Sequence, residues 1–216
     1  MSKIFDLDFR KGSLIANYPN ILPDTYVYSN FCKYTRGYSV KFNNSQKTTY
    51  KNIKLSNLTL FSVIIAVTGK YSISDSGFVL NAQTSINNIT SIALNPYQDG
   101  SIFVNLNYNQ SGYAQIPKNV KQGDQHICVI FDGTNPVNNN RVKMYLNSLP
   151  QTLSLSTIPS SIIKGNQPNF SFYGASNTGV KWYYVKVFDH VLTQEEITND
   201  YSNFLLSKPL QIAKTF

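Results

Sequence analysis

Charged side chains are scarce in this chain of 216 residues, where they make up 14% of the sequence. Ordinary soluble domains have roughly 25%. The surface is therefore expected to consist mainly of uncharged polar groups, a composition shared by adhesins, lectins and virion shell proteins. The net charge is +8, but lysines such as Lys47, Lys118 and Lys143 are scattered along the chain. This pattern predicts a general attraction to anionic surfaces and no nucleic-acid groove.

Residues that bind metals or act as nucleophiles are equally few. The chain has two histidines, His126 and His190, and two cysteines, Cys32 and Cys128. No CxxC or HxxxH spacing is present, which excludes the usual zinc motifs. We therefore expect no metal and no other cofactor. Both thiols are expected to be free and mostly buried, since no secretory signal is seen. Nucleophilic catalysis would need one of the histidines beside a cysteine or a serine, and the sequence leaves open whether the fold brings such a pair together.

Long apolar runs are absent as well. The longest run, Leu58–Val67, is too short to cross a bilayer and is rich in β-branched residues, so it predicts a buried strand. The amino terminus alternates Phe5, Leu7 and Phe9 with aspartates, which predicts a first strand in place of a signal peptide. We expect neither membrane insertion nor conventional secretion.

Short apolar runs separated by Asn, Ser, Gly and Pro clusters are abundant, as around residues 98–101 and 135–140. This spacing is typical of an antiparallel β-sandwich. The length and the absence of a linker predict one domain over residues 1–204. Residues 205–216 are predicted to form a tail that adds a strand to its own sheet or reaches a neighbouring subunit.

A strand followed by a capped helix is predicted at residues 185–197, V-K-V-F-D-H-V-L-T-Q-E-E-I. Thr193 and Glu196 form a capping box, so a short helix should begin at Gln194 and end near Phe204. The preceding residues alternate with the period of a strand that has one buried face.

This segment resembles the closing strand and helix of laminin G-like domains in the concanavalin A-like lectin and glucanase superfamily, which usually end V-R-I-Y-N-R-A-L-S-x-E-E-I. The stretches H-I-C-V-I-F-D-G at 126–133 and V-K-M-Y-L-N at 142–147 are similar to two further strands of that family. Ser148 stands where a turn glycine is common. The resemblance implies an all-β, concanavalin A-like jelly-roll β-sandwich of two antiparallel sheets with one short C-terminal helix.

Two properties found in this superfamily, calcium binding and glycosidase activity, have to be considered for this chain. Relatives hold calcium with acidic residues where this chain reads Trp182, Tyr183 and Tyr184, so we expect no calcium site. Glucanases of the superfamily use two Glu residues on one strand. Here Glu195 and Glu196 are adjacent on the predicted helix, which excludes that pair. An aspartate pair is conceivable, but these aspartates sit at predicted turns, where they satisfy backbone donors: Asp75, Asp99, Asp124 and Asp132. We expect a protein that is not an enzyme.

Aromatic and amide side chains remain as candidates for a binding surface. Trp182, Tyr184, Lys186 and Phe188 are predicted to share the strand face opposite Tyr183, Val185 and Val187. Sugar rings stack on aromatic rings, and sugar hydroxyls bond to amides. The candidate carbohydrate contacts are therefore Trp182, Tyr184, Asn105 and Asn107. The alternative is that the aromatic residues form a second buried layer.

These observations favour a non-enzymatic binding or structural module. Free-standing laminin G-like domains with Asn-, Tyr- and Lys-rich composition look like head-decoration or fibre proteins of bacteriophage virions. Such a protein would be made in the host cytoplasm and act outside after lysis. Its partners would be other virion proteins, further copies of itself or a host-surface polysaccharide. A purely structural capsid or tail cement protein without sugar binding is the alternative, and a carbohydrate-active enzyme is the less favoured one.

Overall fold

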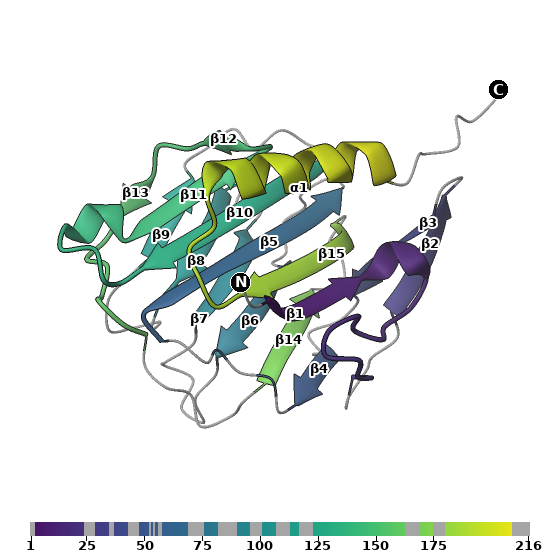
Figure 1. The fold of residues 1–216 in the computed structure, drawn as a ribbon. Helices are drawn as coiled ribbons and strands as arrows, with labels where there is room; N and C mark the ends of the chain where they lie inside the picture. Colours follow the sequence, from purple (N-terminus) through teal and green to yellow (C-terminus); the bar gives the residue numbers. More distant parts are fainter. Residues whose placement is uncertain are drawn as a thin grey trace.

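Two antiparallel sheets lie face to face in the computed structural model, and one C-terminal helix lies across the outer face of one sheet (Figure 1). This arrangement confirms the predicted all-β sandwich. The structure describes residues 3–23, 29–34, 37–42, 48–51, 53, 55, 58–68, 76–81, 90–95, 101–106, 113–116, 123–162, 169–174 and 180–208.

The first sheet, sheet A, has eight strands among the described residues, and its centre is formed by segments far apart in the chain. One edge of β15 pairs with β5, and the opposite edge is shared by two strands. β3 pairs there with Trp182, near the start of β15, and β1 pairs with the residues from Tyr184 to Phe188. The order is β12 (Leu149–Pro150), β11 (Val142–Leu146), β10 (Gln125–Asp132), β5 (Leu60–Thr68), β15 (Lys181–Phe188), β3 (Gly37–Phe42) and β2 (Ser29–Tyr34), with β1 (Lys3–Asp8) beside β15.

In the part of the chain that the structure describes, the second sheet, sheet B, has seven strands. Its order is β13 (Ser154–Leu155), β9 (Tyr113–Ile116), β8 (Ser101–Asn105), β7 (Thr90–Asn95), β6 (Ser76–Asn81), β14 (Asn169–Gly174) and β4 (Thr48–Lys51). The short 3₁₀ helices η1 (Phe9–Lys11) and η2 (Asn138–Asn140) lie in connections.

Aromatic rings fill much of the space between the sheets. The ring of Phe5 on β1 meets those of Phe170 and Tyr50 edge to face, with centroids 5.3 and 5.2 Å apart, a geometry that the ring quadrupole favours. Phe5 and Leu7 are fully buried, as the alternation of the amino-terminal strand predicts. The core therefore ties the first strand of the chain to sheet B.

The helix α1 (Gln194–Ser207) forms a second apolar layer on the outer face of sheet A (Figure 1). It begins at Gln194 with the predicted capping box, because the Thr193 N–H donates to Glu196 Oε2 (2.7 Å) and the Glu196 N–H donates to Thr193 Oγ1 (3.2 Å). β5 and β10 are consequently buried on both faces. No helix among the described residues is long and apolar enough to span a membrane.

The helix ends three residues beyond the predicted limit at Phe204. Phe204 packs against Tyr183 and Tyr184, with ring centroids 5.7 and 5.9 Å away, which holds the last turns on the sheet. Lys208 is extended (φ −63°, ψ 143°), as expected for a residue that precedes a proline. The first residues of the predicted tail are thus helical, and residues 209–216 lie outside the described part.

The two cysteines lie on strands that are well separated in sheet A. Cys128 on β10 is free and buried, as predicted. Cys32 belongs to β2, four strand spacings from β10, or about 19 Å. A disulfide needs Cα atoms within about 7 Å, so the two cysteines do not pair. The side chain of Cys32 lies outside the described part of the chain.

The turn between β11 and β12 has both central residues in the left-handed region, Asn147 with φ 53° and Ser148 with φ 63°. This is the pattern of a type I′ hairpin turn, which favours Asn-Gly. Asn147 is well suited, since its Oδ1 accepts the His126 N–H at 2.9 Å. Ser148 occupies the position where the sequence resemblance places a glycine.

Replacing Ser148 by Gly is therefore expected to stabilise the fold by about 0.5 kcal/mol, because relief of left-handed strain outweighs the extra entropy of the unfolded chain. Urea unfolding measures the change. Ser202→Gly, on an exposed part of α1, is the matched control and should lose about 0.5 kcal/mol. A loss of stability in Ser148→Gly would contradict the turn assignment.

Candidate functional site

Trp182 is fully buried between the two sheets, not on an open face. Its ring meets Phe172 of sheet B edge to face, with centroids 5.4 Å apart. The reason is a β-bulge: Trp182 pairs with Val67 and Tyr184 with Ala66, so Tyr183 is an extra residue on β15. The bulge reverses the alternation, and Trp182 joins Val185 in the core. The prediction that Trp182 contacts a carbohydrate is wrong in this structure.

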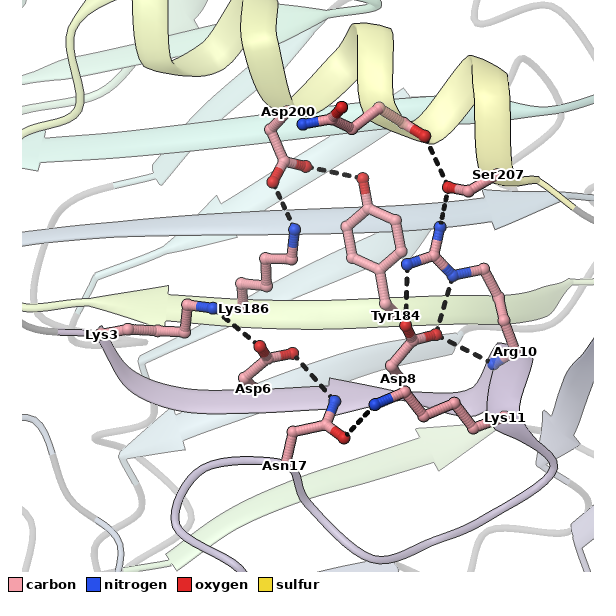
Figure 2. A network of polar contacts seen from close by, with 11 residues as sticks. Lys3, Asp6, Asp8, Arg10, Lys11, Asn17, Tyr184, Lys186, Asp200 and Ser207 are labelled. Carbon is pink, nitrogen blue, oxygen red and sulfur yellow. Dashed lines mark hydrogen bonds and ion pairs between the residues drawn. The ribbon is translucent and has the colours of Figure 1, made fainter.

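Tyr184 faces outward from sheet A, as predicted, but α1 covers it and leaves 1% of it exposed. Its hydroxyl donates to Asp200 Oδ1 at 2.7 Å. The ring lies between two cations, with Arg10 Cζ at 4.7 Å and Lys186 Nζ at 4.6 Å from its centroid. Tyr184 is therefore also closed to a sugar, and it belongs to a polar network that holds the helix (Figure 2).

Asp200 on α1 is the centre of this network. Besides Tyr184, its carboxylate contacts His126 Nε2 at 3.1 Å and forms an ion pair with Lys186. Burial alone raises the pKa of Asp200, but the hydrogen bond from His126 and the charge of Lys186 outweigh it and hold the pKa below its usual range. Figure 2 shows Lys186 and Tyr184 reaching from β15 toward Asp200 on the helix.

A second ion pair supports the carboxyl end of the helix, whereas Asp200 lies in its middle. The Arg10 guanidinium donates from Nε and Nη2 to the two Asp8 oxygens, both at 2.8 Å, and also bonds to the Ser207 hydroxyl (Figure 2). Near the carboxyl end of α1, Lys208 pairs with Asp124 at 2.8 Å. These contacts join strands to the helix, and their carboxylates are satisfied by cations.

The network lacks the features of a catalytic site. His126 is fully buried, and among the described residues no group bonds to its Nδ1. Cys128 lies two residues further along the same strand face, as predicted, and burial raises the pKa of its thiol, which disfavours the nucleophilic thiolate. His190 is partly exposed beside Asp189, at 3.3 Å. We assign the Asp200 network to anchoring α1 on sheet A.

The aspartates considered as a glycosidase pair have structural partners where they are described. Asp132 accepts the Thr134 N–H at 3.1 Å and the Thr134 hydroxyl at 2.6 Å, a turn contact. Asp124 accepts the Tyr183 hydroxyl at 3.0 Å in addition to its ion pair. Asp75 and Asp99 lie outside the described residues. Within the described ranges, no three His, Cys, Asp or Glu side chains come together as metal ligands.

Asn105 does lie on an outer face, that of sheet B. It is partly exposed at the end of β8, while the neighbouring Val104 is buried in the core. Phe103 and Gln115, which are paired across β8 and β9, are also partly exposed. Asn107 falls outside the described residues. Of the four predicted contacts, Asn105 is the one that the structure places on an open sheet face.

Asn105 ends a row of paired residues that crosses sheet B and is polar on four of its five strands. Asn105 pairs with Ser91, Ser91 with Val79, Val79 with Ser171 and Ser171 with Thr49. Four strand spacings separate the ends of this row, or about 19 Å. Ser91 and Ser171 are 5% exposed, and Thr49 and Asn105 more so. We call Thr49, Ser171, Ser91 and Asn105, with Phe103 and Gln115 beside them, the polar row.

Part of the polar row could be foreseen from the sequence. Thr49 and Ser171 each stand between two residues that are buried in the core, the pattern of a strand with one polar face. The order of the strands in sheet B could not be read from this alternation. The order β8, β7, β6, β14 and β4 in sheet B is what places the residues of the polar row side by side.

Solved structures share this fold at low sequence identity. The receptor binding domain of botulinum neurotoxin type G matches with a TM-score of 0.67 and 15% identity over 94% of this chain. The binding domain of botulinum neurotoxin DC, in complex with rat synaptotagmin II, matches with a TM-score of 0.69 and 12% identity over 94%. The chain spans about half the length of these domains, 51% and 52%.

A domain of similar size matches as well. Domain 4 of AbnA, an extracellular arabinanase from Geobacillus stearothermophilus, in complex with arabinotriose, has a TM-score of 0.61 and 16% identity, over 92% of this chain and 97% of that domain. No protein-family profile and no curated protein sequence matches this chain. At these identities the likeness establishes the sandwich fold.

Proposed function

We propose that this chain is a non-enzymatic binding module that recognises a glycan receptor through the outer face of sheet B. The polar row is the observation that carries the proposal. α1 covers the middle of the outer face of sheet A, over β5, β10 and β15. The outer face of sheet B instead carries hydroxyl and amide groups in line, which are partly exposed at the two ends of the row, Thr49 and Asn105. Such groups can exchange hydrogen bonds with sugar hydroxyls.

The structural neighbours support the same class of function. Two of them are binding domains of neurotoxins, one described as a receptor binding domain, and a third was solved with arabinotriose. A sandwich of this fold can therefore work as a separate binding domain. This support concerns the class of function, and the position of the site rests on the polar row.

The setting we propose is a bacteriophage virion, as a head-decoration or fibre component that meets a host-surface polysaccharide. This setting rests on the sequence: the low charge content and the resemblance to free-standing laminin G-like domains. Synthesis in the host cytoplasm and exposure after lysis belong to the same proposal. The alternative, a cement protein of the capsid or tail, needs no sugar.

The test is a screen of the purified chain against bacterial surface polysaccharides. Asn105→Ala is expected to weaken binding about tenfold, the effect of losing a well-placed contact, without a change in melting temperature. Asn199→Ala, on the exposed side of α1, is the matched control and should bind like the wild type. Binding that Asn105→Ala leaves unchanged would overturn the site. A wild type that binds no glycan would favour the cement role.

A further inference from the structure

A hollow of about 180 Å³ lies at the edge of the sandwich where the two sheets meet. Its lining residues come from η2, from β11 and β12 of sheet A, and from the chain that leads from β12 through β13 of sheet B. Figure 1 shows β11, β12 and β13 together at one side of the sandwich. We call this hollow the edge groove. Its lining consists of Asn139, Val142, Lys143, Met144, Tyr145, Pro150, Gln151, Leu153 and Leu155.

The edge groove combines an apolar lining with polar groups. Met144 is buried, and Leu153 and Leu155 pack against the core, so they supply apolar surface. Lys143 and Tyr145 alternate on one face of β11 and are more exposed than Met144 between them. Binding sites for drug-sized molecules usually enclose about 300–1,000 Å³. The smaller volume suits one ring of a longer ligand.

The walls of the edge groove are held by hydrogen bonds. The Gln151 N–H donates to the Met144 carbonyl at 2.9 Å, and Gln151 Nε2 donates to the Leu149 carbonyl at 2.9 Å. The Asn138 side chain accepts the Ile158 N–H at 2.7 Å, which ties η2 to the chain beyond β13. The groove is therefore largely formed before a ligand arrives, which lowers the entropy lost on binding.

The charge around the edge groove is positive. Lys143 is exposed, and no carboxylate of the described residues forms an ion pair with it. The neighbouring Arg141 is already engaged with the carbonyls of Asn135 (2.9 Å) and Ile158 (2.8 Å). The sequence has no Asp or Glu between Gly133 and Phe188. An anion that enters the groove thus meets a free ammonium group with no competing carboxylate from this segment.

We propose that the edge groove binds one acidic sugar residue, with its carboxylate at Lys143 and its ring against Tyr145. The Asn139 amide lines the groove and would meet ring hydroxyls, while Gln151, whose Nε2 is bonded to the Leu149 carbonyl, would accept from them through its Oε1. This inference rests on the proposed function, since it names a class of sugar and a second contact region for glycan recognition. It does not depend on the polar row, because the groove lies at the β11–β13 edge of the sandwich and the row crosses the outer face of sheet B.

The test is a titration of the full chain followed by NMR, with methyl glucuronide, methyl sialoside and neutral methyl glucoside as probes. We expect at least one acidic sugar to bind about fivefold more tightly than the glucoside, the effect of one exposed charge contact, with shifts at Lys143 and Tyr145. Lys143→Gln should remove this preference. Lys11→Gln, the same charge change on a distant exposed lysine, should keep it.

Equal binding of acidic and neutral sugars, no binding of any probe, or a preference that Lys143→Gln retains would each overturn the inference. The result separates it from the proposed function. If polysaccharide binding depends on Asn105 and the NMR titration gives no shifts at Lys143 and Tyr145, the polar row is supported as a binding site and the edge groove is excluded. If the preference for an acidic sugar depends on Lys143 and Asn105→Ala does not change polysaccharide binding, the edge groove is supported as a binding site and the polar row is excluded.

Discussion

Asp200→Ala should cost about 3 kcal/mol of folding free energy, near the lower end of the range for breaking a buried ion pair. The lower end applies because the Asp200 and Lys186 side chains keep 14% and 19% exposure. The substitution leaves the Lys186 ammonium, the Tyr184 hydroxyl and the buried His126 ring without their common partner. Urea unfolding followed by circular dichroism measures the loss.

The loss should also depend on pH. A carboxyl group in an unfolded chain titrates near pH 3.9, and the pKa of Asp200 in the fold is lower. Its stabilisation is therefore fully present above about pH 5 and is lost as the pH falls through 4 toward the folded pKa. The difference between wild type and Asp200→Ala should shrink over that window. Glu195→Gln, on the exposed side of the same helix, is the control and should change little. A wild-type advantage that is as large at pH 2 as at pH 7 would contradict the role of Asp200.

Trp182→Ala should cost about 3–5 kcal/mol, because it opens a cavity between the sheets where the indole now contacts Phe172. Trp182→Phe keeps most of the buried ring and should cost clearly less. Chemical unfolding followed by circular dichroism suits both variants. Trp182 is the only tryptophan of the chain, so both variants also lose the tryptophan fluorescence.

The size of this effect matters for any study of sugar binding. If Trp182→Ala failed to bind a glycan, the loss would report a damaged core and not a missing contact. Asn105→Ala is the better probe, since Asn105 is partly exposed at the end of its strand. A Trp182→Ala variant with wild-type stability would show that the indole is not a core residue.

Features set by neighbouring residues were predicted correctly from the sequence. The capping box at Thr193 and Glu196 places the start of α1, and the alternation of the first strand places Phe5 and Leu7 in the core. Both depend on contacts within a few residues. The face of Trp182 was predicted wrongly, because strict alternation was assumed and the extra residue at Tyr183 shifts it by one.

Features that depend on distant segments could not be predicted in the same way. Asp200 has the sequence pattern of an ordinary polar helix residue, and its partners come from β10 and β15. The edge groove likewise needs β11 and β13, which belong to different sheets, to lie together. Among the proposed contacts, Asn105 was found because one exposed strand residue can be recognised by local alternation alone.

The position of β15 inside sheet A has a consequence for synthesis of the protein. β15 is the last of the described strands along the chain, so the ribosome makes it after its neighbours, yet it lies between β5 on one side and β1 and β3 on the other. β1, the first of the described strands, has β15 as its strand partner in sheet A and must wait for it. A nascent chain that ends before Lys181 therefore leaves the middle of sheet A open, with apolar strand edges available to proteases, chaperones and other nascent chains.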